Sequence, residues 1–162
     1  GQVPGRPPLM AVLAQREDGL EIDDDPARVD PDRTYDLVVG QGYWANDRSR
    51  EQVARSIPAS WCFGVYDGAE QVGFARVVTD RVTFAWVCDV IVDEPYRGRG
   101  IGHWLMRTVT EAVGATGVRR QILATADAHE VYRSVGYAEL DHPERWMEKD
   151  DRPPVGEPAA RG

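Results

Sequence analysis

A change in hydrophobic period occurs within residues 89–106, which read DVIVDEPYRGRGIGHWLM. The run from Thr83 to Val92 predicts a long central β-strand, because it is apolar on both faces. From Ile101 to Ala112, apolar residues instead recur three to four positions apart, which predicts a helix with one apolar face. Residues 97–103, between these two elements, contain three glycines and two arginines. A strand, a glycine-rich loop and a helix start therefore follow one another directly.

The glycine-rich loop has the chemistry of a phosphate or pyrophosphate site. Glycine lets the backbone come close to a ligand. The free N–H groups at a helix start, together with the helix dipole, attract an anion. The two arginines add fixed positive charge. We therefore expect a phosphate group to be bound by Arg97, Gly98, Arg99, Gly100, Ile101, Gly102 and His103.

Two familiar anion-binding motifs do not match this loop. A P-loop requires Lys and then Ser or Thr after its last glycine, whereas His103 follows Gly102. A dinucleotide-binding fingerprint requires its third glycine at the position of His103. The pattern that remains is Arg-x-x-Gly-x-Gly, formed by Arg97, Gly100 and Gly102. A glycine-rich turn without a ligand is the alternative.

The composition is that of an ordinary globular chain, and it argues against several classes of protein. The chain has 162 residues, of which 42% are hydrophobic and 28% charged, and its net charge is −8. Proteins that bind nucleic acid are typically basic, so this charge argues against nucleic acid. A negative field would attract a cationic amine, but simple solubility is the preferred explanation of the charge. No apolar run reaches the roughly 18 residues of a membrane helix. Cys62 and Cys88 lie in apolar runs without a zinc-binding pattern, so we expect no metal site and a cytoplasmic protein.

The rest of the chain predicts one α/β domain between two flexible ends. We expect a flexible N-terminal extension over residues 1–18, a folded domain over 19–149 and a disordered tail over 150–162. The predicted strands are 20–22, 61–66, 71–79, 83–92 and 121–124, with final strand positions at Tyr137 and Trp146–Met147. The predicted helices are 32–39, 48–55, 101–112 and 127–135, the last with Asp127 and Glu130 as a capping pair. Tight turns make the first strands antiparallel, and one crossover helix makes the last pair parallel.

Residues 89–106 resemble motif A of the GNAT superfamily of N-acetyltransferases. Residues 128–137 resemble its second signature, an alanine followed four residues later by Tyr132 and then by a glycine and an aromatic residue. The resemblance covers most of the predicted domain. It implies a mixed, mostly antiparallel sheet with helices on both faces and a V-shaped split between the parallel strands 83–92 and 121–124. Tyr43-Trp44, residues 72–80 and residues 127–129 are similar to a group of small bacterial-type members, many without an assigned substrate.

The resemblance implies that coenzyme A, brought as acetyl-CoA, lies in this split. Its pantetheine arm would pair with open backbone groups of Val90, Ile91 and Val92, as an added strand does. Its pyrophosphate would lie on residues 97–103. Thr125 stands where the family often has an asparagine that contacts the pantetheine, and a hydroxyl can still form that bond.

Two residues are candidates for acid–base chemistry. Tyr132 matches the family tyrosine that faces the coenzyme sulfur, where it would protonate the departing thiolate. Judged from the helical pattern alone, Tyr132 could equally be a packing aromatic. Asp89 is a candidate base, because a carboxylate within an apolar strand tends to have a raised pKa. The alternative for Asp89 is a structural carboxylate, and many family members use no protein base.

The acceptor side is expected to be aromatic. Tyr43, Trp44, Phe84 and Trp86 are the candidate acceptor-pocket residues, since aromatic faces can hold a cationic amine; ordinary packing is the alternative for each. The leading hypothesis is an enzyme that moves an acetyl group from acetyl-CoA to a primary amine of a small molecule. The alternatives are a non-catalytic acyl-CoA-binding or regulatory module and a protein N-terminal or lysine acetyltransferase. Dimers are common in the family, so a homodimer is considered by analogy.

Overall fold

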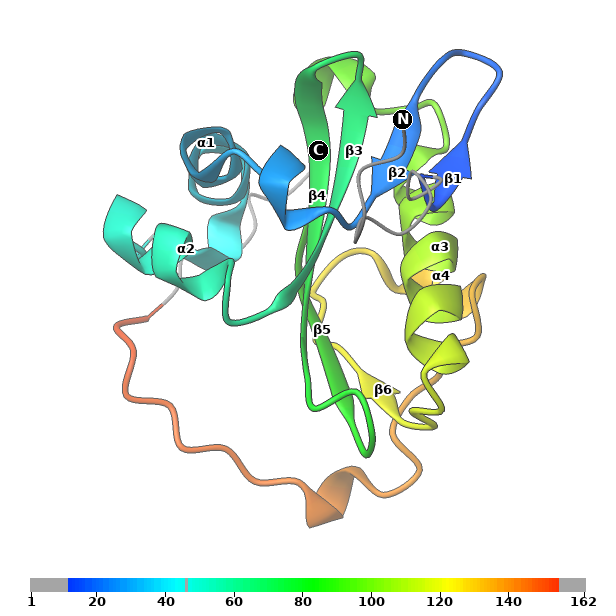
Figure 1. Ribbon diagram of the computed structural model, residues 1–162. Coiled ribbons are helices and arrows are strands. Elements are labelled where there is room, and N and C mark those ends of the chain that lie inside the picture. Colours follow the sequence, from blue (N-terminus) through cyan, green and yellow to red (C-terminus); the bar gives the residue numbers. More distant parts are fainter. Residues whose placement is uncertain (1–11, 46, 155–162) are drawn as a thin grey trace, which may run out of the picture.

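Six strands form one sheet within residues 12–45 and 47–154, which the computed structural model describes (Figure 1). They lie side by side in chain order: β1 (Ala14–Gln15), β2 (Glu21–Asp23), β3 (Trp61–Asp67), β4 (Glu70–Thr79), β5 (Ala85–Val92) and β6 (Gln121–Ile122). All neighbours are antiparallel except β5 and β6, which are parallel. The predicted mixed, mostly antiparallel sheet is therefore confirmed.

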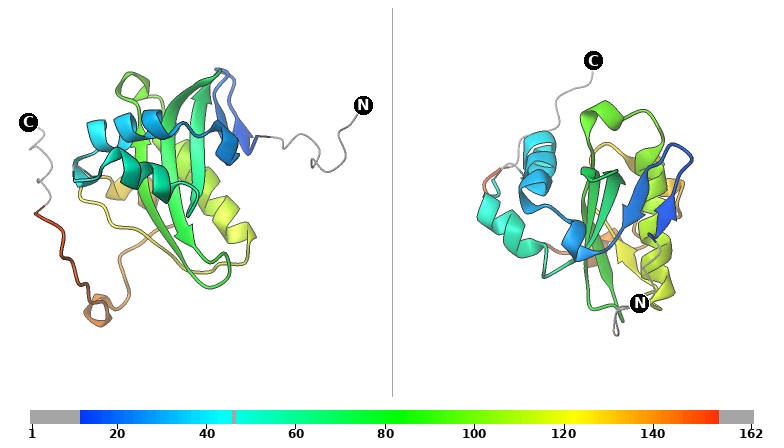
Figure 2. Two further views of the ribbon diagram at one scale, coloured as in Figure 1. Left: turned by 60° about the vertical axis from the view of Figure 1, so that its left-hand side comes forward. Right: turned by 45° about the horizontal axis from the view of Figure 1, so that its top comes forward.

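Helices cover both faces of the sheet (Figures 1 and 2). One face carries α1 (Pro31–Gln41) and α2 (Arg50–Ser56), and the other carries α3 (Ile101–Ala115) and α4 (His129–Arg133). Asp30 caps the start of α1, and Ser49 forms a capping box with Gln52 at the start of α2. Four short 3-10 turns complete the described structure: Pro26–Arg28, Tyr43–Ala45, Glu94–Tyr96 and Pro143–Arg145. Among the described residues, no helix combines the length and the apolar character that crossing a bilayer requires.

A bulge in β5 exchanges the two faces of that strand. Asp89 and Val90 together lie opposite the single residue Ala75 of β4, and Asp89 has a φ of +52°. Before the bulge, Val87 packs into the core beneath α3. Beyond it, Ile91 packs into the core beneath α1 and α2, although it lies four positions after Val87 and would face the same side in a regular strand. The bulge therefore turns Asp89 toward the face that α1 and α2 cover.

β5 and β6 part soon after they meet. Their register joins Ala85 to Gln121 and Trp86 to Ile122, where β6 ends, whereas β5 continues to Val92. The part of β5 beyond Trp86 has no strand neighbour on that side among the described residues. The predicted split between the two parallel strands is confirmed as this open edge.

Several elements before the end of α4 differ from the prediction. The strand predicted over 121–124 ends at Ile122, and the helix predicted over 127–135 is His129–Arg133. β1 lies within the predicted flexible extension, where Ala14 pairs with Ile22 of β2. β5 begins at Ala85 rather than Thr83, because Asp80 accepts the backbone N–H groups that follow it and holds them in a turn. The predicted capping pair of Asp127 and Glu130 at α4 is also wrong: the helix has Ala128 as its N-cap and no side-chain cap, and the Thr125 hydroxyl accepts the N–H groups of Asp127 and Ala128 in the turn before it.

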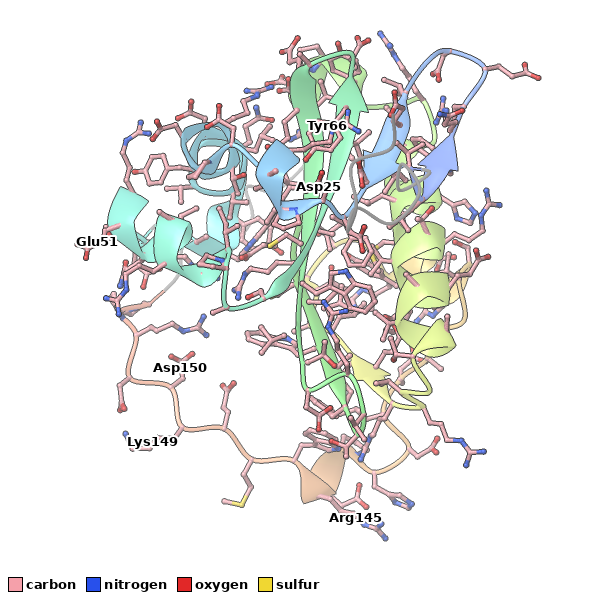
Figure 3. All side chains as sticks on the ribbon, in the orientation of Figure 1. Asp25, Glu51, Tyr66, Arg145, Lys149 and Asp150 are labelled. Atoms are coloured by element: carbon pink, nitrogen blue, oxygen red, sulfur yellow. The ribbon has the colours of Figure 1, made fainter. Side chains whose placement is uncertain are left out.

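Residues 137–154 form no strand, so the predicted final strand positions, Tyr137 and Trp146–Met147, are wrong. Tyr137 instead packs against the core beneath α3 and donates its hydroxyl to Gln121 Oε1 at 2.9 Å. Pro143 begins a 3-10 turn, which interrupts an extended chain. The segment with Arg145, Lys149 and Asp150 then runs outside the sheet (Figure 3). Residues 1–11 and 155–162 of the predicted flexible ends lie outside the described residues.

Candidate active site

The start of α3 leaves a set of backbone N–H groups without partners. Gly98 and Gly100 have left-handed φ values of +80° and +73°, which glycine adopts without strain, and they turn the chain into the helix. The Trp104 N–H donates to the Gly100 carbonyl at 3.1 Å, which is the first hydrogen bond of α3. The N–H groups of residues 101–103 therefore have no acceptor among the described residues.

The space in front of these N–H groups is open. A Cβ atom built on Gly98, Gly100 or Gly102 would meet no atom within 4 Å. Gly102 has no positive φ, so the fold itself does not require glycine there. Free N–H groups, open space and the positive end of the helix dipole together fit a phosphate or diphosphate group. We refer to the backbone of residues 98–103 as the cradle.

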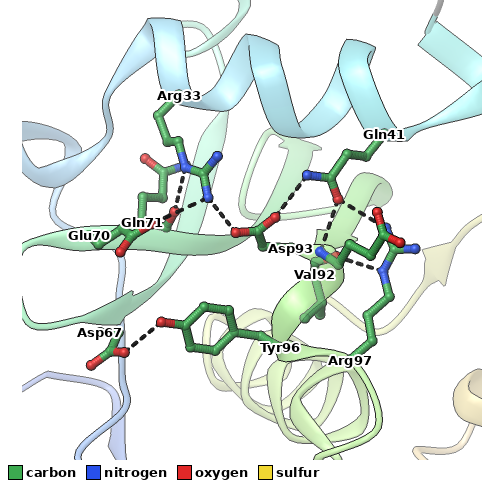
Figure 4. A network of polar contacts seen from close by, with 10 residues as sticks. Arg33, Gln41, Asp67, Glu70, Gln71, Val92, Asp93, Tyr96 and Arg97 are labelled. Carbon is green, nitrogen blue, oxygen red and sulfur yellow. Dashed lines mark hydrogen bonds and ion pairs between the residues drawn. The ribbon is translucent and has the colours of Figure 1, made fainter.

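Both arginines of the loop place positive charge beside the cradle, but other parts of the chain hold their side chains. Arg97 donates from Nε to the Val92 carbonyl at 3.0 Å and from Nη2 to Gln41 Oε1 at 3.1 Å (Figure 4). The Arg99 guanidinium lies over the ring of Tyr96, 5.1 Å from its centroid. The Arg97 side chain therefore links the loop to the end of β5 and to α1 by hydrogen bonds.

A buried carboxylate at the end of β5 ties the same loop to α1. Asp93 accepts hydrogen bonds from Arg33 Nη2 at 2.6 Å and from Gln41 Nε2 at 2.8 Å (Figure 4). The Gln41 oxygen in turn accepts the Glu94 N–H at 3.0 Å. Burial opposes ionisation of Asp93, but the bonds from Gln41 and Arg33 outweigh it and lower the pKa of the carboxyl. The network fixes the direction in which the chain leaves β5.

Backbone alternation decides which groups of β5 face the open edge. The Asp93 N–H donates to the Val72 carbonyl at 2.8 Å, so the backbone groups of Asp93 and, two residues earlier, of Ile91 face β4. Those of Val90 and Val92 face the other way. The prediction of a pantetheine contact from Ile91 is therefore corrected. The backbone groups of Val90 and Val92 face the open edge, as the predicted pantetheine contact requires. The Val92 carbonyl also accepts the hydrogen bond from Arg97.

Tyr132 projects from α4 toward a cavity. It lines a cavity of about 270 Å³ together with Leu123, Thr125 and His129, among others. Its ring lies 6.1 Å from that of Tyr137, and none of the side-chain hydrogen bonds of the described residues involves its hydroxyl. Burial, with a smaller contribution from the negative charge of Asp127, raises the pKa of Tyr132 to about 12. Thr125 also lines this cavity, while its hydroxyl accepts the backbone N–H of Ala128 just before α4.

One hydrogen bond joins the cradle to the helix of Tyr132. His103 Nδ1 lies 2.8 Å from the hydroxyl oxygen of Ser134, at the end of α4. The His103 side chain is thus directed toward α4, whereas its backbone N–H belongs to the cradle. The two candidate ligand-binding features are therefore parts of one connected unit.

Asp89 is an ion-paired carboxylate. It accepts hydrogen bonds from Arg48 Nη1 at 2.6 Å, from Arg76 Nε at 2.8 Å and from the indole N–H of Trp44 at 3.1 Å. Burial opposes ionisation, but the hydrogen bonds and positive charges of Arg48 and Arg76 outweigh it and lower the pKa of Asp89. The predicted raised pKa is therefore wrong. The contacts are those of the structural alternative and do not suit a base.

A family model described as an acetyltransferase (GNAT) domain matches residues 58–139, which contain the cradle and Tyr132. The chain belongs to the GNAT acetyltransferase family. A candidate GNAT-family acetyltransferase from Xanthomonas campestris pv. campestris is 34% identical, with a TM-score of 0.77 over 85% of this chain and 95% of that protein. A candidate acetyltransferase of Gibberella zeae is 30% identical over 122 residues, which is 61% of this chain and 69% of the relative. A GNAT acetyltransferase of Elizabethkingia anophelis, solved with acetyl-CoA bound, shares the fold at a TM-score of 0.61 and 17% identity, over 78% of this chain and 80% of that one.

The predicted acceptor-pocket aromatics of this GNAT enzyme fall into two groups. Tyr43 and Trp44 pack edge to face, with ring centroids 5.3 Å apart, and Trp44 reaches Asp89. Trp86 lies on β5 near the bulge, and 42% of it is exposed. Phe84 lies in the turn before β5, where its carbonyl accepts the Thr79 hydroxyl at 2.6 Å. Tyr43 and Trp44 thus join the Asp89 cluster, Trp86 offers an open aromatic surface, and Phe84 belongs to a turn.

Sequence reasoning missed several polar residues of this GNAT site, and three of them show why. Arg48 and Arg76 are the partners of Asp89, and Gln41 joins Arg97 to Asp93. Arg76 carried a signal, because it is a charge in the middle of an apolar strand and requires a buried partner. Arg48 and Gln41 carried none, since their roles depend on how the α1–α2 region packs on the sheet.

Proposed function

We propose that this GNAT enzyme transfers the acetyl group of acetyl-CoA to a primary amine of a small molecule, by direct attack within a ternary complex. The observation that carries the proposal is that one connected unit contains both the cradle at the start of α3 and the Tyr132 hydroxyl, which has no partner among the described residues. The first feature suits the diphosphate of a coenzyme, and the second suits its sulfur. The open edge of β5 provides extended backbone for the arm between them.

The binding contacts follow from the free groups described above. The N–H groups of residues 101–103 would hold the diphosphate. Val90 and Val92 would pair with the amides of the pantetheine arm, as an added strand does. This leaves the thioester near the bulge, where the chain offers backbone N–H groups that can stabilise an oxyanion.

The chemistry requires a new C–N bond to the thioester carbonyl carbon and cleavage of its C–S bond. The amine must lose a proton, and the departing sulfur must carry or share its negative charge. Tyr132, with a pKa of about 12, stays protonated at neutral pH. A thiol has a pKa of roughly 8.5, so Tyr132 holds its proton more tightly than the leaving group does. We therefore assign Tyr132 as a hydrogen-bond donor to the developing thiolate.

The proton of the amine leaves by another route. Asp89 is a poor acceptor for it, because its lowered pKa and its two arginine partners stabilise the ionised form. We assign water as the acceptor of that proton. The coenzyme A thiolate takes up one proton from water in turn, so the net reaction converts the amine and acetyl-CoA into the amide and free coenzyme A thiol and leaves the enzyme unchanged.

The test is the release of free thiol from acetyl-CoA in the presence of a panel of primary amines. Wild type is expected to release thiol with at least one amine. Tyr132→Phe is expected to lower kcat at least about tenfold with little change in the KM for acetyl-CoA, because the lost bond forms mainly in the transition state. Tyr35→Phe, which removes a phenol hydroxyl on α1, is the matched control and should behave as wild type. Tight acetyl-CoA binding without turnover on any amine would instead support a non-catalytic acyl-CoA-binding module.

A further inference from the structure

We infer that the acceptor amine carries a carboxylate, and that Arg48 and Arg76 bind it beside the bulge of β5. This inference rests on the acetyl transfer proposed above and names the substrate class. It narrows the expected acceptor from any primary amine of a small molecule to one that also carries a carboxylate.

The charges around Asp89 do not cancel. Arg48 and Arg76 both pair with Asp89 Oδ2, so two positive charges meet one negative charge. Three ionisable groups raise the pKa of Arg76 against the effect of burial: the Asp89 carboxylate and the thiols of Cys62 and Cys88. Burial raises the pKa of both thiols, to about 11 and about 12, so they are neutral at pH 7. The cluster therefore keeps one positive charge.

Asp89 needs only one arginine to neutralise it, so the presence of both Arg76 and Arg48 requires an explanation. A buried carboxylate is neutralised by one guanidinium, and a second adds a charge whose removal from water is unfavourable. The side chains of Asp89 and Arg76 are 3% and 11% exposed, whereas that of Arg48 is 23% exposed. Arg48 thus brings its extra charge to the opening of the cluster, where an anion from solvent can reach it.

Both guanidinium groups also keep free donors. Arg48 donates through Nη1 alone, and Arg76 through Nε and through Nη1, which binds the Ser60 hydroxyl at 3.1 Å. Arg48 Nε and Nη2 and Arg76 Nη2 have no acceptor among the described residues. Guanidinium groups bind carboxylates through paired N–H donors, which makes a carboxylate the fitting ligand.

Side-chain contacts connect this cluster to the proposed reaction centre. Trp44 donates to Asp89 and packs edge-on against Tyr43. The Tyr43 phenol lies close enough to Tyr132 to contribute to its raised pKa. An amine placed between Tyr132 and the bulge can therefore direct a carboxylate toward Arg48, with the exposed indole of Trp86 beside it on the same strand.

The first experiment compares matched acceptors on wild type. Each set contains an amino acid, its amide and the amine that lacks the carboxyl carbon. The kcat/KM for the acid is expected to exceed that for the amide at least about tenfold, because hydrogen bonds to charged groups are strong. Basicity cannot produce this preference: the amino group beside an amide has a pKa near 8, so the amide contains more of the reactive free amine. Equal rates, or faster reaction of the amide or amine, would overturn the inference and leave the acetyl transfer intact.

Failure of turnover on every amine would count against the proposed function, and the inference has a readout that does not depend on turnover. Calorimetry compares the binding of N-acetyl amino acids with that of their amides. The acids are expected to bind at least about tenfold more tightly. Equal affinities, or no binding of either, would overturn the carboxylate site.

The second experiment changes Arg48 to Gln. Asp89 keeps Arg76 and Trp44 as partners, so the fold is expected to persist. The ratio of kcat/KM for the acid to kcat/KM for the amide should fall at least about tenfold, whatever the change in the amide rate itself. A purely structural role of Arg48 would lower both alike and would contradict the inference. Arg50→Gln, which changes an arginine whose side chain is 58% exposed on α2, is the matched control. If Arg48→Gln does not fold, Arg48→Lys keeps the charge without the paired donors and should retain only part of the preference.

Discussion

Asp89 and Arg76 face each other across the bulge of the central strand, with Oδ2 of the aspartate 2.8 Å from Nε of the arginine. Asp89 also has a φ of +52°, a region that aspartate tolerates better than most residues but that still disfavours folding. The bonds from Arg76, Arg48 and Trp44 hold it there. The same contacts therefore stabilise the bulge, lower the pKa of Asp89 and open the edge of β5 next to the proposed reaction centre.

Replacing Asp89 by alanine is expected to lower the free energy of unfolding by about 3 kcal/mol, because it leaves two arginines without their buried partner. Urea denaturation measures this change. Asp36→Ala is the control, since Asp36 pairs with Arg50 on the surface, where both side chains are more than half exposed. That variant should stay within about 0.5 kcal/mol of wild type. Equal losses for the two variants would contradict the structural role of Asp89.

The pH dependence of stability should carry the same signature. The folded-state pKa of Asp89 is lowered, so its contribution is complete above the ordinary value of about 3.9 and is lost as the pH falls through the lower folded value. The difference in unfolding free energy between wild type and Asp89→Asn is therefore expected to shrink below about pH 4. Denaturation curves from neutral pH down to acidic pH measure it. A difference that does not change with pH would refute the ion pairing of Asp89.

A substitution in the cradle should change the affinity for coenzyme A without changing the free energy of unfolding. Gly102→Val places a side chain in the open space before the free N–H groups, and it should weaken coenzyme A binding at least about tenfold. Gly114→Val is the matched control, because Gly114 lies on the same helix, also without a positive φ and with open space around it. Both variants should change the unfolding free energy by no more than about 0.5 kcal/mol. Titration calorimetry gives the affinities, and equal binding by the two variants would contradict the cradle.

Gly100→Ala tests the conformation of the same loop. Its φ of +73° is unfavourable for alanine, so this variant should lose stability by about 1–2 kcal/mol even without a ligand. Thermal unfolding of the ligand-free protein measures the loss. Unchanged stability would show that the turn into α3 does not require a left-handed residue.

The high pKa of Tyr132 should be reflected in how kcat/KM depends on pH. Because burial raises it to about 12, the phenol stays protonated across the alkaline range in which an ordinary tyrosine begins to ionise. The pH profile of kcat/KM is therefore expected to show no decline from Tyr132 up to about pH 10. A decline near that pH in wild type that disappears in Tyr132→Phe would contradict the burial of the hydroxyl.

The sequence predicted the strand, the cradle and the helix after it because period and glycine spacing are local properties. It failed where packing decides the outcome. The chain after Tyr137 contains strand-like residues, but Pro143 interrupts it and Tyr137 is drawn to Gln121. The bulge at Asp89 could not be predicted from a regular alternation of apolar and polar residues either, since one extra residue exchanges the faces of the strand.

The chemistry of the site could be predicted only where it depends on a local motif. Tyr132 could be placed from its motif, whereas the role of Asp89 depended on partners far away in the chain. Arg48 lies 41 residues from Asp89 and Arg76 lies 13 residues from it. Without those two side chains, burial alone predicts a raised pKa; with them, the direction reverses.

The most direct test of the central claim is the transfer of an isotopically labelled acetyl group from acetyl-CoA to an amine, followed by mass spectrometry of the product and of the enzyme. We expect the label in an N-acetylated amine, one free coenzyme A thiol per product, and no labelled enzyme, because attack is direct. Labelled protein without labelled amine, or intact acetyl-CoA after incubation with the full amine panel, would contradict the assignment of this chain as an N-acetyltransferase of small amines.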